Sequence, residues 1–302
     1  MFALLSLALT RATHHHSSSS SLDARSSSSN SARCPAATKG LLFNHVSKTG
    51  GTVMKELLIS AMGAAGCAAV GCPDAQSQKD RKSGWDNVTI INRNEHTSAS
   101  SSLIGVDGAL VIQEDVYNLT VSSADAASFF VVGTVRRPCD YMVSFWAFES
   151  AQYDDERKWG VTPPYDTPND TARFDTWVSD VTAQRDRGAS RLDGATFMST
   201  ALSGRYDDAG RDVHCWVRTH SMVTDLKRCM AQYEACGGTY VRDGLSESAV
   251  KQAVQKGTAG IPPSEYANCS TFFKEGTDTW ASVMTSEAQL IADYDLGKCC
   301  SD

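Results

Sequence analysis

Hydrophobic residues gather in short runs along the chain, and polar or glycine-rich residues separate the runs. Leu41–Val46 is an apolar run that ends in a glycine-containing turn, and Thr52–Met62 continues with apolar residues at helical spacing. Ser128–Val135 combines aromatic and β-branched residues without any charge, which is typical of a buried strand. These runs predict a strand, a loop and a helix, followed later by a second buried strand.

The remaining periodic segments alternate between the same two kinds of element. Shorter apolar runs predict strands over Val88–Ile91, Ala109–Ile112, Val213–Val217 and Thr239–Val241. Helical spacing predicts helices from Pro138 onward and over Thr171–Thr182, Met222–Tyr233 and Thr285–Tyr294. Strands that alternate with helices predict an α/β fold, with a central parallel sheet flanked by helices in a P-loop-like arrangement of three layers. Ligands of such sheets bind beyond the carboxyl ends of the strands.

The first 39 residues differ in composition from the rest of the chain. Phe2–Leu9 has the length of a signal-peptide core, although no Lys or Arg precedes it, and it is shorter than the roughly 20 residues that a spanning helix needs. Residues 11–39 are rich in Ser, Ala and Arg without apolar periodicity, which is typical of a disordered stem. We therefore expect a signal-like segment and stem over residues 1–39 and a single domain over residues 40–300.

Cysteines and glycosylation sequons both indicate the secretory pathway. The chain has 10 cysteines, an even number that favours disulfides and an oxidising compartment. Four sequons begin at Asn87, Asn118, Asn169 and Asn268. Cys67 and Cys72 are candidates for a local pair. Cys229 and Cys236 lie two turns apart in a predicted helix, roughly 10 Å, which is too far to bridge.

A glycine-rich segment, residues 47–52, stands between the first predicted strand and its helix. Glycines allow the backbone to approach an anion, and the start of the helix offers unpaired N–H groups with a partial positive charge. Its candidate ligand groups for a phosphate or sulfate are Lys48, Thr49, Gly50, Gly51 and Thr52. It is not a Walker A loop, because the lysine precedes the glycines. Taken alone, the segment also fits a simple glycine-rich turn with a solvated lysine.

A second anion-binding pattern follows the strongest strand prediction. Arg136 ends the strand, Pro138 opens a helix, and Ser144 lies two helical turns further on. The planar fork of an arginine together with a hydroxyl suits a terminal phosphate. The neighbouring Arg137 either pairs elsewhere or adds charge to the same site.

Both patterns resemble motifs of one enzyme family. Residues 45–52, HVSKTGGT, resemble the HVPKTGGT-type 5′-phosphosulfate loop of Golgi carbohydrate sulfotransferases, the group that contains uronyl 2-O- and heparan 6-O-sulfotransferases. Ser47 stands where that family usually has proline. Arg136, Pro138 and Ser144 match the family's 3′-phosphate motif, Arg-x-Pro with a serine eight residues after the arginine. The resemblance extends more weakly over residues 41–298, and it places His220 where an acidic residue is common.

The resemblance implies a sulfotransferase that uses 3′-phosphoadenosine 5′-phosphosulfate (PAPS) as co-substrate and needs no metal. In-line transfer of a sulfuryl group requires a cation beside the breaking bond and a base for the acceptor's proton. Lys48 has the position of the cation. His96 is the predicted base, because relatives place a catalytic His or Glu in the corresponding region and an imidazole titrates near neutrality. Glu95 is the alternative base, and His45 and His220 are further ones.

The charge balance limits the partners. A net charge of −7 argues against a nucleic-acid partner, and it leaves an N-terminal anchor as the only expected membrane contact. The family implies a glycan as acceptor and the Golgi lumen or membrane as location. Two alternatives remain open: a non-catalytic secreted module with a sulfotransferase-like fold, and a P-loop nucleotide kinase.

Overall fold

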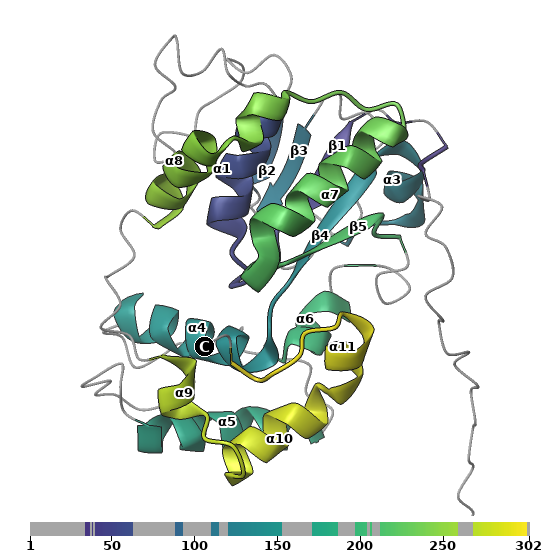
Figure 1. The fold of residues 1–302 in the computed structure, drawn as a ribbon. Helices are drawn as coiled ribbons and strands as arrows, with labels where there is room; N and C mark the ends of the chain where they lie inside the picture. Colours follow the sequence, from purple (N-terminus) through teal and green to yellow (C-terminus); the bar gives the residue numbers. More distant parts are fainter. Residues whose placement is uncertain are drawn as a thin grey trace, which may run out of the picture. The chain divides into compact units, whose positions relative to one another are not determined.

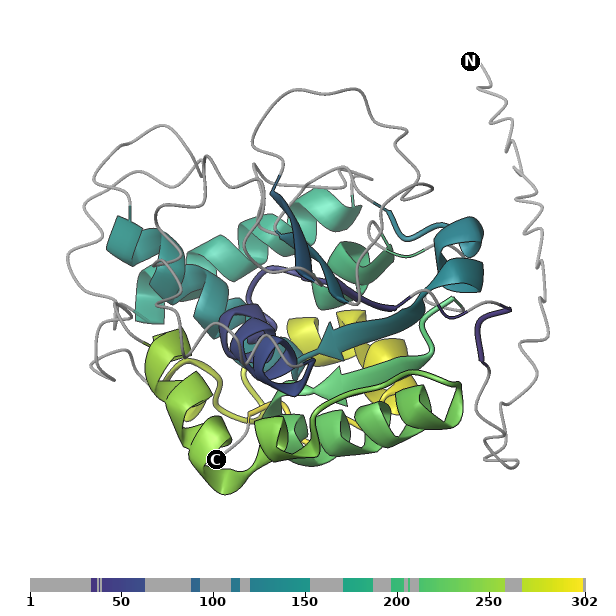
Figure 2. The same ribbon diagram turned by 90° about the horizontal axis from the view of Figure 1, so that it is seen from above.

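The computed structural model describes residues 34–36, 38, 40–62, 88–92, 110–114, 120–152, 171–186, 197–203, 206, 212–258 and 268–300. All of them belong to the larger of two units into which the chain divides, Ala32–Asp302. The smaller unit, Met1–Ser31, lies outside the described residues. Figures 1 and 2 show the described elements of the larger unit from two sides.

Within the described residues, five parallel strands form one sheet in the order β2-β3-β1-β4-β5 (Figure 1). The strands are β1 (Leu41–Asn44), β2 (Val88–Asn92), β3 (Leu110–Glu114), β4 (Phe130–Val135) and β5 (Cys215–Arg218). The central strand β1 pairs with β3 on one side and with β4 on the other. The predicted α/β fold with a parallel central sheet is therefore confirmed.

Alternate side chains of the strands enter two separate hydrophobic cores, one on each face of the sheet. Leu41 and Phe43 of β1 lie in one core together with Val132 of β4, whereas Leu42 and Val131 lie in the other. All five side chains are fully buried. Because both faces of the strands are covered, the sequence shows continuous apolar runs instead of an alternation of apolar and polar residues.

Helices supply the outer two layers (Figures 1 and 2). The first core is completed by α1 (Gly51–Ala61), α7 (Met222–Ala235), α8 (Glu247–Thr258) and the short helix η4 (Arg242–Leu245). The second core is completed by α3 (Ser123–Ser128), α4 (Pro138–Gln152), α5 (Thr171–Asp186), α6 (Met198–Ser203), α9 (Cys269–Phe272), α10 (Asp278–Ser286) and α11 (Ala288–Asp293). A further short helix, η3 (Thr219–Ser221), joins β5 to α7.

The strand order makes the carboxyl ends of β1 and β4 the topological switch point of the sheet. From β1 the chain proceeds to β2 on one side of the sheet, and from β4 it proceeds to β5 on the opposite side. Loops that leave neighbouring strands in opposite directions mark the place at which open α/β sheets bind their ligands. The two predicted anion-binding motifs follow β1 and β4, so the topology brings them to this one place.

Three expectations from the sequence are wrong in detail. Thr239–Val241 is an irregular segment, in which the Val241 amide donates to the carbonyl of Ala61, and it is not a strand. The predicted helix Thr285–Tyr294 is two helices, because Glu287 leaves helical geometry and its buried carboxylate accepts hydrogen bonds from Ser199 at the start of α6. The domain also begins before residue 40, since Cys34 is bonded to Cys236.

Four disulfides join the eight cysteines that lie within the described residues. The pairs are Cys34–Cys236, Cys139–Cys299, Cys215–Cys229 and Cys269–Cys300. Cys229 and Cys236 do not bridge each other, as expected, and the predicted pair of Cys67 and Cys72 lies outside the described residues. Several disulfides indicate a protein of the extracellular space or of the lumen of the secretory pathway.

One of the four sequons, at Asn268, lies within the described residues. Asn268 is exposed at the start of α9, which is the surface position that a glycosylation acceptor requires. The other three sequons lie outside the described residues. None of the described helices is long and apolar enough to cross a membrane.

The Cys215–Cys229 disulfide ties β5 to α7 and closes a loop with a sequence separation of 14 residues. Replacing both cysteines by alanine should lower the free energy of unfolding by about 3 kcal/mol, because the unfolded chain regains the entropy of that loop. Urea unfolding under non-oxidising handling measures the change. The matched variant without Cys34–Cys236, whose sequence separation is 202, should lose more. Unchanged stability of the first variant contradicts the pairing.

Candidate functional site

The loop between β1 and α1 takes two left-handed backbone conformations. Lys48 has φ 64° and Gly50 has φ 79°. Glycine adopts this region without cost, whereas a lysine there costs about 1–2 kcal/mol, so the surrounding structure has to hold it. Gly50 is also the residue that caps α1, and a side chain there would collide with Met222 and approach Thr219 closely. Gly50 therefore allows both the turn and the close approach of the segment after β5.

Gly51, the first residue of α1, makes room for the ring of His45. A Cβ atom at Gly51 would overlap the imidazole, which also stacks on Phe43 with ring centroids 5.9 Å apart. His45 is thus held by packing at the start of α1. The two glycines of the motif have different tasks, because Gly50 is required by backbone conformation and Gly51 by the volume of a neighbour.

Thr49 links the loop to the sheet. Its hydroxyl is fully buried, donates to the carbonyl of Val46 at 2.6 Å, and lies 2.6 Å from the hydroxyl of Thr134 in β4. The carbonyl oxygen of Val46 can only accept, so the Thr49 proton goes to Val46 and Thr134 donates to Thr49. The sequence predicted this hydroxyl as a donor to a bound anion, but the structure uses it inside the loop. Thr52, by contrast, is exposed on the first turn of α1.

Arg136 reaches from the end of β4 to the loop after β1. Its guanidinium donates to the carbonyl of Lys48 at 2.9 Å, so the two predicted anion-binding motifs are in direct contact. Arg136 is partly buried, and it forms no ion pair with any residue that the structure describes. Burial lowers the pKa of the Arg136 guanidinium, while the nearby carboxylate of Asp140 acts in the opposite direction. Burial of a cation costs free energy when no ion pair offsets it, so an anion beside this guanidinium is favoured.

The segment after β5 joins the same site through Thr219. The hydroxyl of Thr219 lies 2.9 Å from the carbonyl of Thr49 and 3.1 Å from the carbonyl of Val135. A single hydroxyl thereby connects the ends of β1, β4 and β5. The turn from β5 into α7 is held by a second contact. Arg218, at the end of β5, donates to the buried carboxylate of Asp225 in α7 from its backbone N–H and from its side chain, each at 2.9 Å. Burial raises the pKa of Asp225, but the hydrogen bonds from Arg218 outweigh it and the net shift is downward.

The C-terminal segment supports the start of α4. Arg137 donates to the carbonyls of Leu296 and Cys300 at 3.1 and 2.7 Å, so it pairs away from the anion site. Cys139, one residue into α4, is bonded to Cys299. Asp140 lies close to the sulfurs of Cys269 and Cys300, but these cysteines are oxidised to a disulfide and do not form a metal-binding set with it.

Ser144 lies in the second turn of α4 and is partly buried. The helix that carries it begins two residues after Arg136, so the position relative to Arg136 is the one that the sequence motif predicted. The candidate bases Glu95 and His96 lie outside the described residues, in the segment after β2. Their roles stay predictions.

His220 is exposed on η3, directly after Thr219. Loss of solvation lowers its pKa first, and the positive charges of Arg137 and Arg218 lower it further. The carboxylates of Asp225 and Asp140 act in the opposite direction without reversing the shift. At neutral pH the imidazole is therefore mainly uncharged.

The helices add to the positive potential of this edge. α1, α4 and the η3–α7 segment all begin at the carboxyl ends of strands, after β1, β4 and β5. Their first N–H groups have no acceptor within the helix, and their dipoles place partial positive charge at these ends. With Lys48 and Arg136 this edge is the natural place for a polyanionic ligand.

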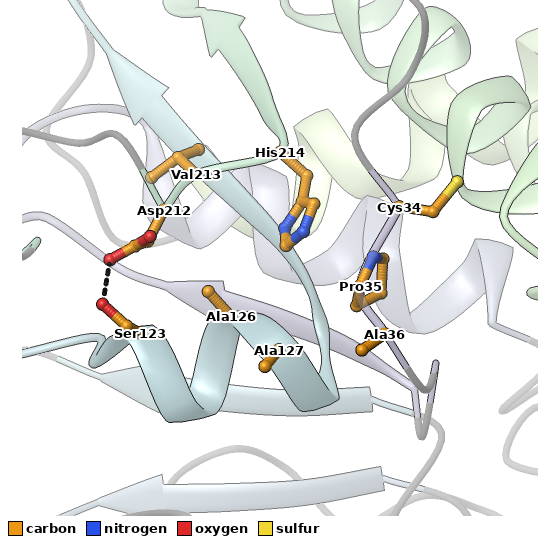
Figure 3. Close-up of a pocket in the computed structure, with 9 residues that line it drawn as sticks. All are labelled: Cys34, Pro35, Ala36, Ser123, Ala126, Ala127, Asp212, Val213 and His214. Atoms are coloured by element: carbon orange, nitrogen blue, oxygen red, sulfur yellow. Dashed lines mark hydrogen bonds between the residues drawn. The ribbon is translucent and has the colours of Figure 1, made fainter.

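A hollow of about 320 Å³ lies at the opposite edge of the sheet (Figure 3). It is lined by the segment before β1, by α3 and by the segment before β5, so it opens at the amino ends of the strands. His214 projects toward it, and its Nδ1 accepts a hydrogen bond from the amide of Val131 at 2.9 Å. This histidine orders the sheet edge and is remote from the two anion-binding motifs.

No local signal in the sequence identifies Thr134, Thr219 or Asp225 as parts of the site. Each acts through a partner that only the fold brings near, and Thr219 and Thr49 are 170 residues apart.

The chain matches no family model, no curated protein and no solved structure.

The buried bonds of Thr49 lead to a direct test of the loop. Thr49→Val should lower the free energy of unfolding by about 1–3 kcal/mol, because the Thr134 hydroxyl loses its partner in the interior and the Val46 carbonyl keeps only the longer bond from the backbone N–H of residue 49. Thr49→Ser retains the hydroxyl and should lose clearly less. Urea unfolding of both variants measures the difference. If the valine variant is as stable as wild type, the hydroxyl does not support the loop.

Proposed function

We propose that the protein is a sulfotransferase that takes a sulfuryl group from PAPS. The observation that carries this proposal is Arg136, a partly buried guanidinium that lies at the switch point, forms no ion pair with a described residue and is hydrogen-bonded to the loop of Lys48. Such a cation suits a permanently charged phosphate. The 3′-phosphate is the group that distinguishes PAPS from ATP.

The two motifs define how the donor would lie. The 5′-phosphosulfate belongs on the loop after β1 with Lys48 and the first N–H groups of α1, and the 3′-phosphate belongs beside Arg136 and Ser144 after β4. Both groups are carried by one ribose, and neighbouring strands are about 5 Å apart, so a single nucleotide spans the two. This orientation directs the nucleoside toward β4 and β5 and the sulfuryl group toward β3 and β2.

The acceptor then approaches from the side of β2, the strand that precedes Glu95 and His96. The acceptor oxygen attacks sulfur, the bond from sulfur to the bridging oxygen of the 5′-phosphate breaks, and adenosine 3′,5′-bisphosphate leaves. Lys48 stabilises the charge that develops on the leaving oxygen. His96, or Glu95 in its place, takes the proton of the acceptor hydroxyl.

A glycan hydroxyl is the proposed acceptor, and the Golgi is the proposed location. The disulfides support a compartment of the secretory pathway, and the loop motif supports a carbohydrate sulfotransferase. The acidic net charge favours a glycan of modest negative charge over a highly sulfated chain.

The role of Arg136 can be measured by comparing two nucleotides that differ only in the 3′-phosphate. Wild type should bind adenosine 3′,5′-bisphosphate more tightly than adenosine 5′-monophosphate. Arg136→Ala should weaken bisphosphate binding by about 10- to 100-fold, the value of a charge-assisted hydrogen bond. Monophosphate binding should change much less, and Arg136→Lys should fall between. Titration calorimetry gives both affinities, and an equal loss for both ligands contradicts the assignment.

Label transfer from PAPS to desulfated glycans tests the chemistry. Lys48→Ala should lower the transfer rate by about 10²- to 10³-fold, because charge on the leaving group is no longer stabilised. His96→Ala should lower it by roughly 10²- to 10⁴-fold with unchanged bisphosphate affinity, and the same loss in Glu95→Gln with an active His96→Ala would make Glu95 the base instead. The wild-type rate should also fall as the pH drops below the pKa of the base. Tight bisphosphate binding without transfer to any glycan would favour the non-catalytic module.

A further inference from the structure

His220 is the exposed titratable group nearest in sequence to Thr219, the residue that joins the three strand ends. The hydroxyl of Thr219 holds the start of η3 against the carbonyls of Thr49 and Val135. Hydrogen bonds from Arg218 to Asp225 fix the same turn between β5 and α7. The backbone of His220 is therefore fixed relative to both anion-binding motifs. Its imidazole is open to solvent, so a ligand can reach it.

The strand order determines which part of the donor faces His220. β5 pairs directly with β4, and Val135, the last residue of β4, is aligned with Arg218. Arg136 and Thr219 follow these two residues, and neighbouring strands are about 5 Å apart. A phosphate beside Arg136 therefore has the β1 loop on one side and η3 on the other. The sulfuryl group lies toward β3, away from His220.

We propose that His220 is a donor-binding residue that contacts the 3′-phosphate from the β5 side, opposite the β1 loop. This inference rests on the proposed function, because it takes the 3′-phosphate to lie at Arg136. It assigns His220 to the nucleotide and not to the acceptor, so it also removes His220 from the candidate bases.

The charges around His220 make its contribution depend on pH. Arg137 at the start of α4 and Arg218 at the end of β5 favour the neutral imidazole, whereas Asp140 in α4 and Asp225 in α7 favour the imidazolium. Asp295 lies 3.5 Å from Arg218 and reduces the effect of that guanidinium. The net result is a pKa below the ordinary value in the free protein. A phosphate dianion placed beside the imidazole favours the charged form, so donor binding raises the pKa and takes up a proton.

The test compares wild type with His220→Asn by titration calorimetry of the full chain at pH 8 and at pH 6. Adenosine 3′,5′-bisphosphate is the probe, and adenosine 5′-monophosphate is the matched ligand without the 3′-phosphate. At pH 8 the dissociation constants of wild type and His220→Asn for the bisphosphate should agree within about threefold. At pH 6, when the imidazole is charged, wild type should bind the bisphosphate at least about tenfold more tightly than His220→Asn. The protonation of the bisphosphate itself affects both proteins equally, so it cancels in the ratio of the wild-type affinity to the His220→Asn affinity at each pH. For the monophosphate the ratio should not change with pH.

A second measurement follows the protons that are taken up on binding. Calorimetry of bisphosphate binding at neutral pH in buffers of different ionisation enthalpy should reveal net proton uptake, and the uptake should be smaller in His220→Asn. An affinity ratio that is independent of pH, or that changes equally for the monophosphate, overturns the role of His220 and leaves the proposed function intact. If wild type does not prefer the bisphosphate to the monophosphate at all, the donor-site assignment fails, and the inference fails with it.

Discussion

Three strand ends meet at a few hydrogen bonds between side chains and backbone carbonyls, and the candidate site depends on them. The hydroxyl of Thr219 approaches the carbonyls of Thr49 and Val135, and the guanidinium of Arg136 donates to the carbonyl of Lys48. Parallel strands alone would fix only the sheet, because their connecting loops have no ladder bonds of their own. These contacts extend the rigidity of the sheet into the loops, which is what preorganised recognition of an anion requires.

The same contacts hold a conformation that the loop would not take by itself. Lys48 lies in the left-handed region, and Gly50 and Gly51 admit Met222 and His45 only because they have no side chains. The strain at Lys48 is of the order of 1–2 kcal/mol, comparable with one good buried hydrogen bond. Arg136 therefore has two roles. It stabilises the strained peptide at Lys48 through a hydrogen bond, and its guanidinium places a positive charge beside the β1 loop. Loss of Arg136 should affect the β1 loop as well as the anion, which is why the two nucleotides must be compared.

Sequence patterns predicted the elements of the sheet well, for a physical reason. A strand covered on both faces is mainly apolar, and β1 and β4, whose residues are all buried, are recognisable as such runs. The loop after β1 and the Arg-x-Pro motif are compact local patterns that a sequence can display, and their role in anion binding stays a prediction. Thr49 was misassigned because a threonine hydroxyl in a loop looks the same whether it faces a ligand or Thr134. The break at Glu287 depends on Ser199, a partner 88 residues away, and no periodicity encodes it.

The net charge of the chain is a poor guide to the potential at this edge. The protein carries −7 overall, yet Lys48, Arg136, Arg137 and His220 follow strands β1, β4 and β5, and Arg218 is the last residue of β5. Arg218 is neutralised by Asp225, and Arg137 is committed to the carbonyls of the C-terminal segment. Of the two arginines after β4, only Arg136 lies against the β1 loop. The local geometry, rather than the sum of charges, therefore decides where an anion is favoured. It also explains how an acidic protein can present an edge at which the local potential favours an anion.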